Sequence, residues 1–204
     1  MKTLIFSLAV IALFTFVSFT GSTSTKSINP SFDLPNGWFI AGNNPNSYKM
    51  GIDKTMGKDG KNAATIKSAK KKIKGFGTLM QMCKADKYKG KKVKMSGSMK
   101  SENVKDWAGF WLRVDGASGE CLAFDNMQDR SVKKTTDWTN YEITLNVSEG
   151  ASNLAYGALL SGTGQIWFDN ITFEIVGNAE KTTDTKDNSK TGMLEEPMNL
   201  DFEK

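Results

Sequence analysis

Residues 141–147 read Tyr-Glu-Ile-Thr-Leu-Asn-Val, and every second side chain in this stretch is apolar or aromatic. Successive side chains of a β-strand point to opposite faces of a sheet, so this alternation predicts a strand with one buried face. Residues 93–99, Val-Lys-Met-Ser-Gly-Ser-Met, follow the same pattern. These two stretches predict a sheet that covers a hydrophobic core.

Further strand-like runs follow in both directions, at a spacing of roughly ten residues. Glycine-containing turns separate them, and no stretch of a dozen residues carries the 3.6-residue apolar stripe of a helix. The sequence therefore predicts an all-β fold, an antiparallel β-sandwich or a barrel. The other candidate strands are 75–83, 108–115, 121–125, 154–161 and 165–176.

Composition excludes several classes of enzyme. The chain has 204 residues, of which 39% are hydrophobic, with 27 Lys and Arg against 22 Asp and Glu and no histidine. The lack of histidine removes the commonest general base and every imidazole metal ligand. No nucleophile elbow, phosphate loop or zinc-ligand spacing occurs either. A glycosidase that uses two carboxylates, drawn from Asp115, Glu120 and Asp125, is left as the enzymatic alternative.

The N-terminus has the pattern of an exported protein. Lys2 precedes an apolar run at 4–19, which is shorter than the about 20 residues that cross a bilayer. Small residues follow the run, so residues 1–25 are predicted to be a signal peptide cleaved near Ser22 or Ser24. The alternative is an uncleaved membrane anchor. Export predicts a secreted, periplasmic or cell-surface location.

Composition also divides the rest of the chain. Residues 26–177 have the length of one sandwich domain, and residues 178–198, mostly Lys, Thr, Asp, Asn, Ser and Glu, are predicted to be a flexible linker. At 199–204 the chain reads Asn-Leu-Asp-Phe-Glu-Lys, which repeats the Asn, Phe and acid of Asn-Pro-Ser-Phe-Asp at 29–33. We interpret the end of the chain as the first residues of a truncated second module.

Two cysteines lie in the exported part, Cys83 and Cys121. An oxidising compartment allows a disulfide between them if their strands are neighbours, and two buried free thiols are the alternative. The sequence leaves both open.

Basic residues are concentrated at 67–94. A nucleic-acid site would need aromatic residues interleaved with this charge and a compartment that holds nucleic acid, and export argues against such a partner. We expect a solvated loop and an edge strand protected by lysines.

Several segments resemble a known bacterial module, the jelly-roll domain of the galactose-binding-like and carbohydrate-binding-module type. The resemblance covers about residues 29–176 and implies a jelly-roll β-sandwich. Such modules are attached to bacterial glycoside hydrolases and, in other proteins, to DNA-binding regulators. The segments are Leu-Pro-Asn-Gly-Trp at 34–38, Gly-Phe-Gly-Thr-Leu-Met-Gln at 75–81, 107–116, 122–127, 135–138 and 159–170.

The resemblance also implies a structural calcium ion. Related modules hold calcium where the first and last strands meet, through the acid of an opening Asn-x-x-Phe-acid motif and the aspartate of a closing Trp-x-Asp-Asn motif. Asp33 and Asp169 match these positions. Calcium prefers carboxylate and carbonyl oxygens. The alternative is that both aspartates bond to backbone amides in turns.

Sugars are bound by aromatic faces and planar polar side chains. The alternation along 109–115 places a tryptophan and an arginine on the face away from the core, and along 78–83 we expect a glutamine to share that face. An aspartate and an asparagine end a further strand at its rim. Alternatively, loops cover the tryptophan. The candidate ligand-binding residues are Trp111, Arg113, Gln81, Asp125 and Asn126.

We therefore predict an exported, non-catalytic module that binds carbohydrate or another small polar ligand and serves a downstream domain. It needs no cofactor other than the possible structural calcium. The alternative is a structural spacer or protein-interaction sandwich without a small-molecule site.

Overall fold

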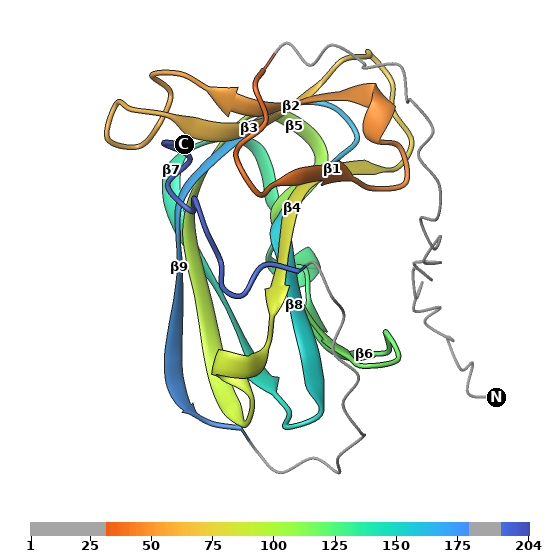
Figure 1. Cartoon of the computed structure of the whole chain (residues 1–204). Coiled ribbons are helices and arrows are strands. Elements are labelled where there is room, and N and C mark those ends of the chain that lie inside the picture. Colours follow the sequence, from red (N-terminus) through yellow and green to blue (C-terminus); the bar gives the residue numbers. More distant parts are fainter. Residues whose placement is uncertain (1–31, 180–192) are drawn as a thin grey trace, which may run out of the picture.

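The computed structural model describes residues 32–179 and 193–204. These residues form an antiparallel β-sandwich of two layers, which Figure 1 shows edge-on. The predicted all-β class is confirmed. The signal peptide predicted at 1–25 lies outside the described residues, and within them no helix has the length and apolar character to span a bilayer.

One nearly closed sheet, bent at β5, makes both layers. The first layer contains β1, β4, β8, the second half of β5, and β6; the second layer contains β2, β3, β9, the first half of β5, and β7. The strands are β1 (Phe39–Ala41), β2 (Tyr48–Asp53), β3 (Ala63–Ser68), β4 (Phe76–Lys84), β5 (Lys91–Gly116), β6 (Cys121–Asp125), β7 (Val132–Val147), β8 (Ala151–Ser161) and β9 (Gln165–Asn178). Short 3-10 turns lie at η1 (Pro45–Ser47), η2 (Asp86–Tyr88) and η3 (Gln128–Arg130).

Strand β5 differs from the sequence prediction, which gave two separate strands at 93–99 and 108–115. In the structure they are two halves of one strand that passes from one layer to the other. The ladder with β7 shifts register between Met99 and Ala108, and Asn103 adopts a positive φ of 53°. This irregular stretch bends the strand, so a single element pairs with β9 before the bend and with β8 after it.

The core lies between the layers, and strand alternation determines which residues enter it. Phe110, Leu112 and Val114 of β5 are buried there, as the alternation predicts. From the second layer, Met95 and Ile143 are register partners on β5 and β7, and both are buried. Residues 93–99 and 141–147, the two stretches from which the sheet was predicted, therefore supply one face of the core.

The lysine-rich stretch is partly as expected. Lys70, Lys71 and Lys72 are exposed between β3 and β4, which agrees with a solvated loop. The expected lysine-protected edge strand is wrong, because the lysines of β5 lie on a strand that has β7 on one side and β9 on the other. Lys92 and Lys94 protrude from the outer face of the second layer, where Lys94 is paired with Glu174 at 2.7 Å.

Residues 193–204, called the C-terminal segment below, do not begin a separate unit in this structure. They cross the same sandwich from β4 to β9 (Figure 1, dark blue). Leu194 forms a parallel bridge with Cys83, and Phe202 is buried in the core. The linker predicted at 178–198 is thus too long at both ends, since β9 runs to Asn178 and residues 193–198 are docked.

Candidate functional site

The outer face of the first layer is the candidate site, and strand register determines which side chains occupy it. Trp111 lies opposite Gly157 of β8, which in turn lies opposite Met80 of β4. Directly opposed residues project from the same face of a sheet. The face therefore crosses three strands, and Arg113, opposite Phe124 of β6, extends it onto a fourth.

A second hydrophobic cluster, separate from the core, lies on this face. Trp111 has only 7% of its surface exposed, and its indole N–H donates to Thr78 Oγ1 at 2.8 Å. The ring is thus fixed in place and is not an open platform. The cluster consists of Met80, Trp111, Ala155 and Leu159, with the half-buried Ala41, Phe76, Met82 and Trp107 packed against it.

A charged group lies beside this cluster. Arg113 makes two contacts with Asp115, Nε to Oδ1 at 2.7 Å and Nη2 to Oδ2 at 3.0 Å. Asn153 Nδ2 donates to Asp115 Oδ2 at 2.9 Å. The Arg113 side chain is 13% exposed and that of Asp115 2%, so the pair is largely removed from water. A planar guanidinium held next to an apolar, aromatic surface can form directed hydrogen bonds with a polar ligand.

The outer face of the second layer is polar by comparison. Lys58 Nζ, on a loop, donates to Ser98 and Asn140, and Ser98 donates to Asn140 at 2.7 Å. Trp167 donates its N–H to Asp53 at 2.7 Å. Of the two outer faces, the first layer's is therefore the one that carries an aromatic cluster.

Two of the predicted residues, Trp111 and Arg113, lie together on this face, but Gln81 does not. The side chains of β4 alternate between the two faces of the sheet as expected, but the faces are exchanged relative to the prediction. Met80 and Met82 face outward, and Gln81 points into the core. Its amide oxygen accepts the Tyr156 hydroxyl and the Met198 N–H. A polar residue in the core is tolerated because these partners, one of them distant in sequence, satisfy its amide.

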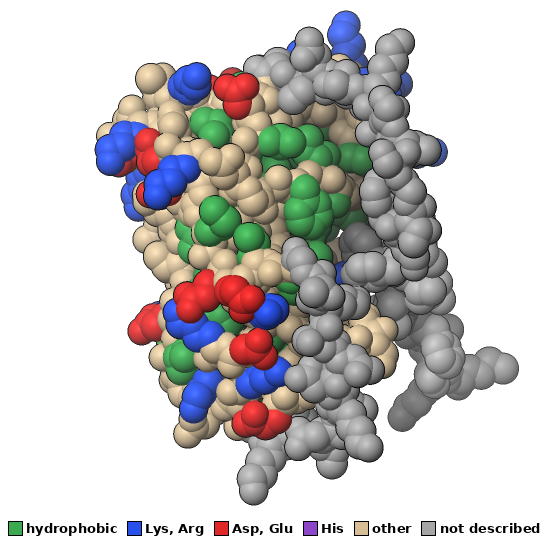
Figure 2. Space-filling model, in the orientation of Figure 1, with side chains coloured by type: hydrophobic (Ala, Val, Ile, Leu, Met, Phe, Trp, Pro, Cys, Tyr) green, Lys and Arg blue, Asp and Glu red, His purple; other side chains and the backbone are tan. Residues whose placement is uncertain are grey.

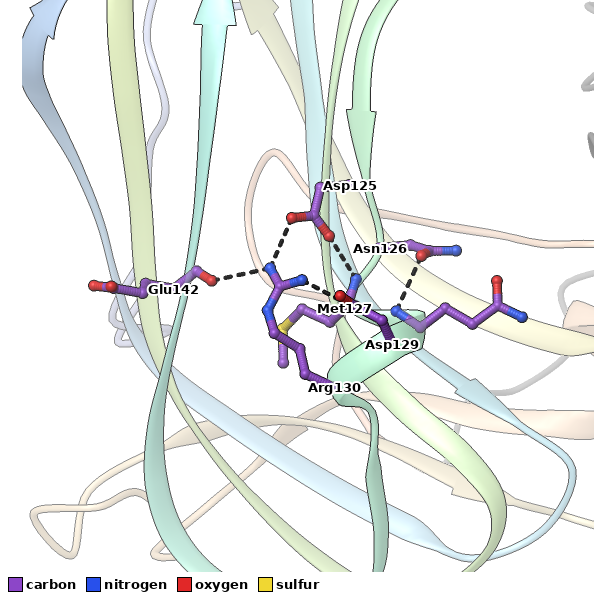
Figure 3. A network of polar contacts seen from close by, with 7 residues as sticks. Asp125, Asn126, Met127, Asp129, Arg130 and Glu142 are labelled. Atoms are coloured by element: carbon purple, nitrogen blue, oxygen red, sulfur yellow. Dashed lines mark hydrogen bonds and ion pairs between the residues drawn. The ribbon is translucent and has the colours of Figure 1, made fainter.

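Asp125 and Asn126 are also placed differently from the prediction. Figure 3 shows them in a turn between β6 and η3, where Asp125 accepts the Met127 N–H at 2.8 Å and Asn126 the Gln128 N–H at 3.1 Å. Arg130 binds the second oxygen of Asp125 at 2.7 Å. Both side chains therefore shape a turn, a local role that Asp and Asn commonly have.

This turn borders a shallow hollow of about 380 Å³ that is separate from the aromatic cluster. It is lined by Phe124, Asp125, Asn126, Gln128, Asp129, Arg130 and Leu145.

The two predicted calcium ligands have different surroundings. Asp33 is exposed and lies 3.9 Å from Lys54 Nζ, whereas Asp169 is buried and accepts the backbone N–H groups of Lys58 and Asn170. Burial raises the pKa of Asp169, and the nearby Asp59 and Glu203 add to the rise. Within residues 32–179 and 193–204 no group of three or more acidic or cysteine side chains is arranged to hold a metal ion. Calcium binding by Asp33 and Asp169 stays a prediction.

Both cysteines are free thiols. The structure therefore has the free thiols and not the disulfide. Cys83 is buried as expected for a free thiol, whereas Cys121 is exposed.

Sequence reasoning missed several residues of the face. Asn153 could have been found from β8, because it has the same parity as Ala155 and Leu159. Trp107 has the same parity as Trp111 on β5, whereas only strand pairing shows that Met80 of β4 shares their face.

The fold belongs to a class, the β-sandwich with the architecture of carbohydrate-binding modules. The CBM22-1 xylan-binding domain of Paenibacillus barcinonensis Xyn10C superimposes with a TM-score of 0.53, over 72% of this chain and 90% of that one, at 16% identity. The CBM22-1 and GH10 modules of Clostridium thermocellum Xyn10B give 0.52 over 72% and 28%, at 14% identity. A Stig cyclase from Fischerella sp. TAU gives 0.51 over 74% and 88%, at 18% identity. These similarities define the fold.

One curated protein is similar in sequence. The chain is 39% identical over 168 residues to a Bacillus subtilis (strain 168) protein named as the uncharacterized HTH-type transcriptional regulator YbfP. The alignment covers 82% of this chain and 56% of that protein, so the chain spans about half the length of the curated relative it matches. No protein-family model matches the chain.

Proposed function

We propose that this chain is an exported, non-catalytic module that binds carbohydrate through the outer face of its first layer. The observation that carries the proposal is the aromatic cluster beside the Arg113–Asp115 pair, in which Phe76 and Trp107 stay half-buried around the packed Trp111. Apolar ring faces stack on sugar rings, and a fixed guanidinium gives directed hydrogen bonds to hydroxyl groups. Xylan-binding modules with the same fold support this assignment.

The module serves another domain by holding it near a polymer, which raises the local concentration of substrate. The Xyn10B neighbour, an endo-1,4-beta-D-xylanase in which such a module accompanies a GH10 module, supports this role. The similarity to YbfP favours a second candidate, a sandwich that senses a ligand on behalf of a DNA-binding regulator. Sugar binding is common to both candidates, whereas export belongs to the first.

Titration calorimetry with xylohexaose and with other oligosaccharides tests the binding face. Trp107 is half-buried at the edge of the cluster, so Trp107→Ala is expected to weaken binding at least about tenfold without loss of the fold. The matched control is Trp138→Ala, a half-buried tryptophan on β7 of the other layer, for which we expect a change below about twofold.

Three results would argue against this function. The wild-type chain could bind none of the sugars, the two tryptophan variants could behave alike, or incubation with the oligosaccharide could release shorter products. The last result would identify an enzyme.

Expression of the full sequence in a bacterium tests export. We expect the protein outside the cytoplasm, with an N-terminus near Ser22 or Ser24, because the apolar run at 4–19 and the small residues after it match a signal peptide. Mass spectrometry of cell fractions measures this. Intact Met1 in the cytoplasmic fraction would favour the regulator-associated candidate.

A further inference from the structure

The C-terminal segment lies on a surface built to hold an extended peptide. Gln81, fully buried on β4, accepts the Met198 N–H at 2.9 Å and donates to the Met198 carbonyl at 3.1 Å. Neighbouring strands recognise each other through the same pair of backbone bonds. A buried amide is costly when it is left without partners, so the Gln81 side chain requires a backbone at this place.

Other groups of the sandwich form hydrogen bonds with the backbone of the segment near both of its ends. Their hydrogen bonds run to carbonyl groups and so do not depend on the side chain of the residue that carries the carbonyl. The donors are Lys84 N to Leu194 O at 2.7 Å, Trp38 Nε1 to Asn199 O at 3.2 Å and Ile171 N to Leu200 O at 3.0 Å.

Side-chain recognition concentrates on Phe202 and Glu203. The Phe202 ring is fully buried, 5.0 Å from the Trp38 ring and 5.2 Å from the Phe168 ring. Asn62 donates its backbone N–H to Glu203 Oε1 at 3.0 Å and its amide to the Phe202 carbonyl at 3.4 Å. An aromatic anchor followed by an acid is thus the sequence that this surface selects.

Charge complementarity holds the other end of the segment. Lys84 lies 2.7 Å from Glu195, and Lys87 lies 2.8 Å from Glu196. In Figure 2, basic and acidic side chains intermingle on the face below the start of the segment. Exposed pairs of this kind add specificity more than affinity.

We propose that this docking surface is a peptide-binding site for an extended segment with the Phe-Glu pair of residues 202 and 203, and that it takes this segment from a second copy of the chain as well as from its own C-terminus. Residues 180–192 join the segment to β9, so the cis segment is present at a high effective concentration. A second copy competes when the chain itself is concentrated or when its own segment is weakened.

A labelled peptide of residues 193–204 tests the site in the full-length chain. Phe202→Ala in the chain removes the anchor of the cis segment, so this variant is expected to bind the wild-type peptide at least about tenfold more tightly than the wild-type chain does. A peptide carrying Phe202→Ala is expected to bind about a hundredfold more weakly. Asp201→Ala, an exposed residue of the same segment, is the control that behaves like the wild-type chain.

Cys83 gives a second readout because Leu194 pairs with it and it is buried. With Cys121 changed to serine, we expect a thiol reagent to label Cys83 at least about tenfold faster in the Phe202→Ala chain, and added peptide to slow the labelling again. If the Phe202→Ala chain does not fold alone, it is refolded with the peptide present, and recovery of the fold replaces the titration.

The proposal fails if the folded Phe202→Ala chain does not bind the peptide, or if the peptide does not rescue an unfolded one. Sedimentation of the wild-type chain tests the exchange between copies. We expect dimers at high concentration that Phe202→Ala removes, and a monomer at every concentration would overturn the part that concerns a second copy.

Discussion

Phe202→Ala is expected to lower the free energy of unfolding by about 3 kcal/mol, at the lower end of the range for a buried phenylalanine. The ring is fully buried between Trp38 and Phe168, and its loss leaves a cavity between aromatic side chains. We use the lower end because the C-terminal segment can detach from the sandwich. The loss of stability then cannot exceed the free energy with which the segment docks. For a domain of this size the melting temperature falls by about 6–12 °C.

Urea denaturation and thermal melting measure this change. The control is Asp201→Ala, one position away and exposed, which we expect to alter stability by no more than about 0.5 kcal/mol. An equally small effect of Phe202→Ala would show that the segment contributes nothing to the stability of the sandwich and would contradict its place in the core.

Asp115→Ala is expected to cost about 3 kcal/mol. The substitution removes both contacts between the carboxylate and Arg113, whose guanidinium is mostly shielded from water. Asn153 also loses its acceptor. Because the pair belongs to the proposed binding face, oligosaccharide binding is expected to fall with the stability.

Asp129→Ala is the matched control for this pair. Asp129 also binds an arginine, Arg130, at 2.9 Å, but its side chain is 82% exposed, so we expect a loss below about 0.5 kcal/mol. The double substitution Arg113→Met with Asp115→Leu is expected to cost less than Asp115→Ala alone, since it removes both shielded charges together. Equal losses for Asp115→Ala and Asp129→Ala would show that burial of the pair is not the cause.

Alternation along the strands could be predicted well, because it depends only on the geometry of an extended chain. Residues 121–125 form β6 with the predicted bounds, and Phe110, Leu112 and Val114 enter the core as expected. The short strands β1, β2 and β3 were missed. They alternate less clearly, since β3 has four consecutive buried residues and β1 only three residues in all.

The assignment of faces was less predictable, as Gln81 shows. A glutamine at an alternating position is expected to face water, and here it faces the core because Tyr156 and the backbone of Met198 supply its partners. The repeat of 29–33 at 199–204 was visible in the sequence. Its interpretation as a second module depended on which part of the protein packs against it in space. In the structure that neighbour is the same sandwich.

Residue order by itself determined the β class, the period of the strands and the local turns, because these depend on contacts between residues close in the chain. Only the tertiary structure decided that one strand serves both layers, that Trp111 is packed against Thr78 and Met80, and that Phe202 completes the core. The physical reason is burial: whether a side chain is removed from water depends on segments that are distant in sequence, and their approach is fixed when the layers close.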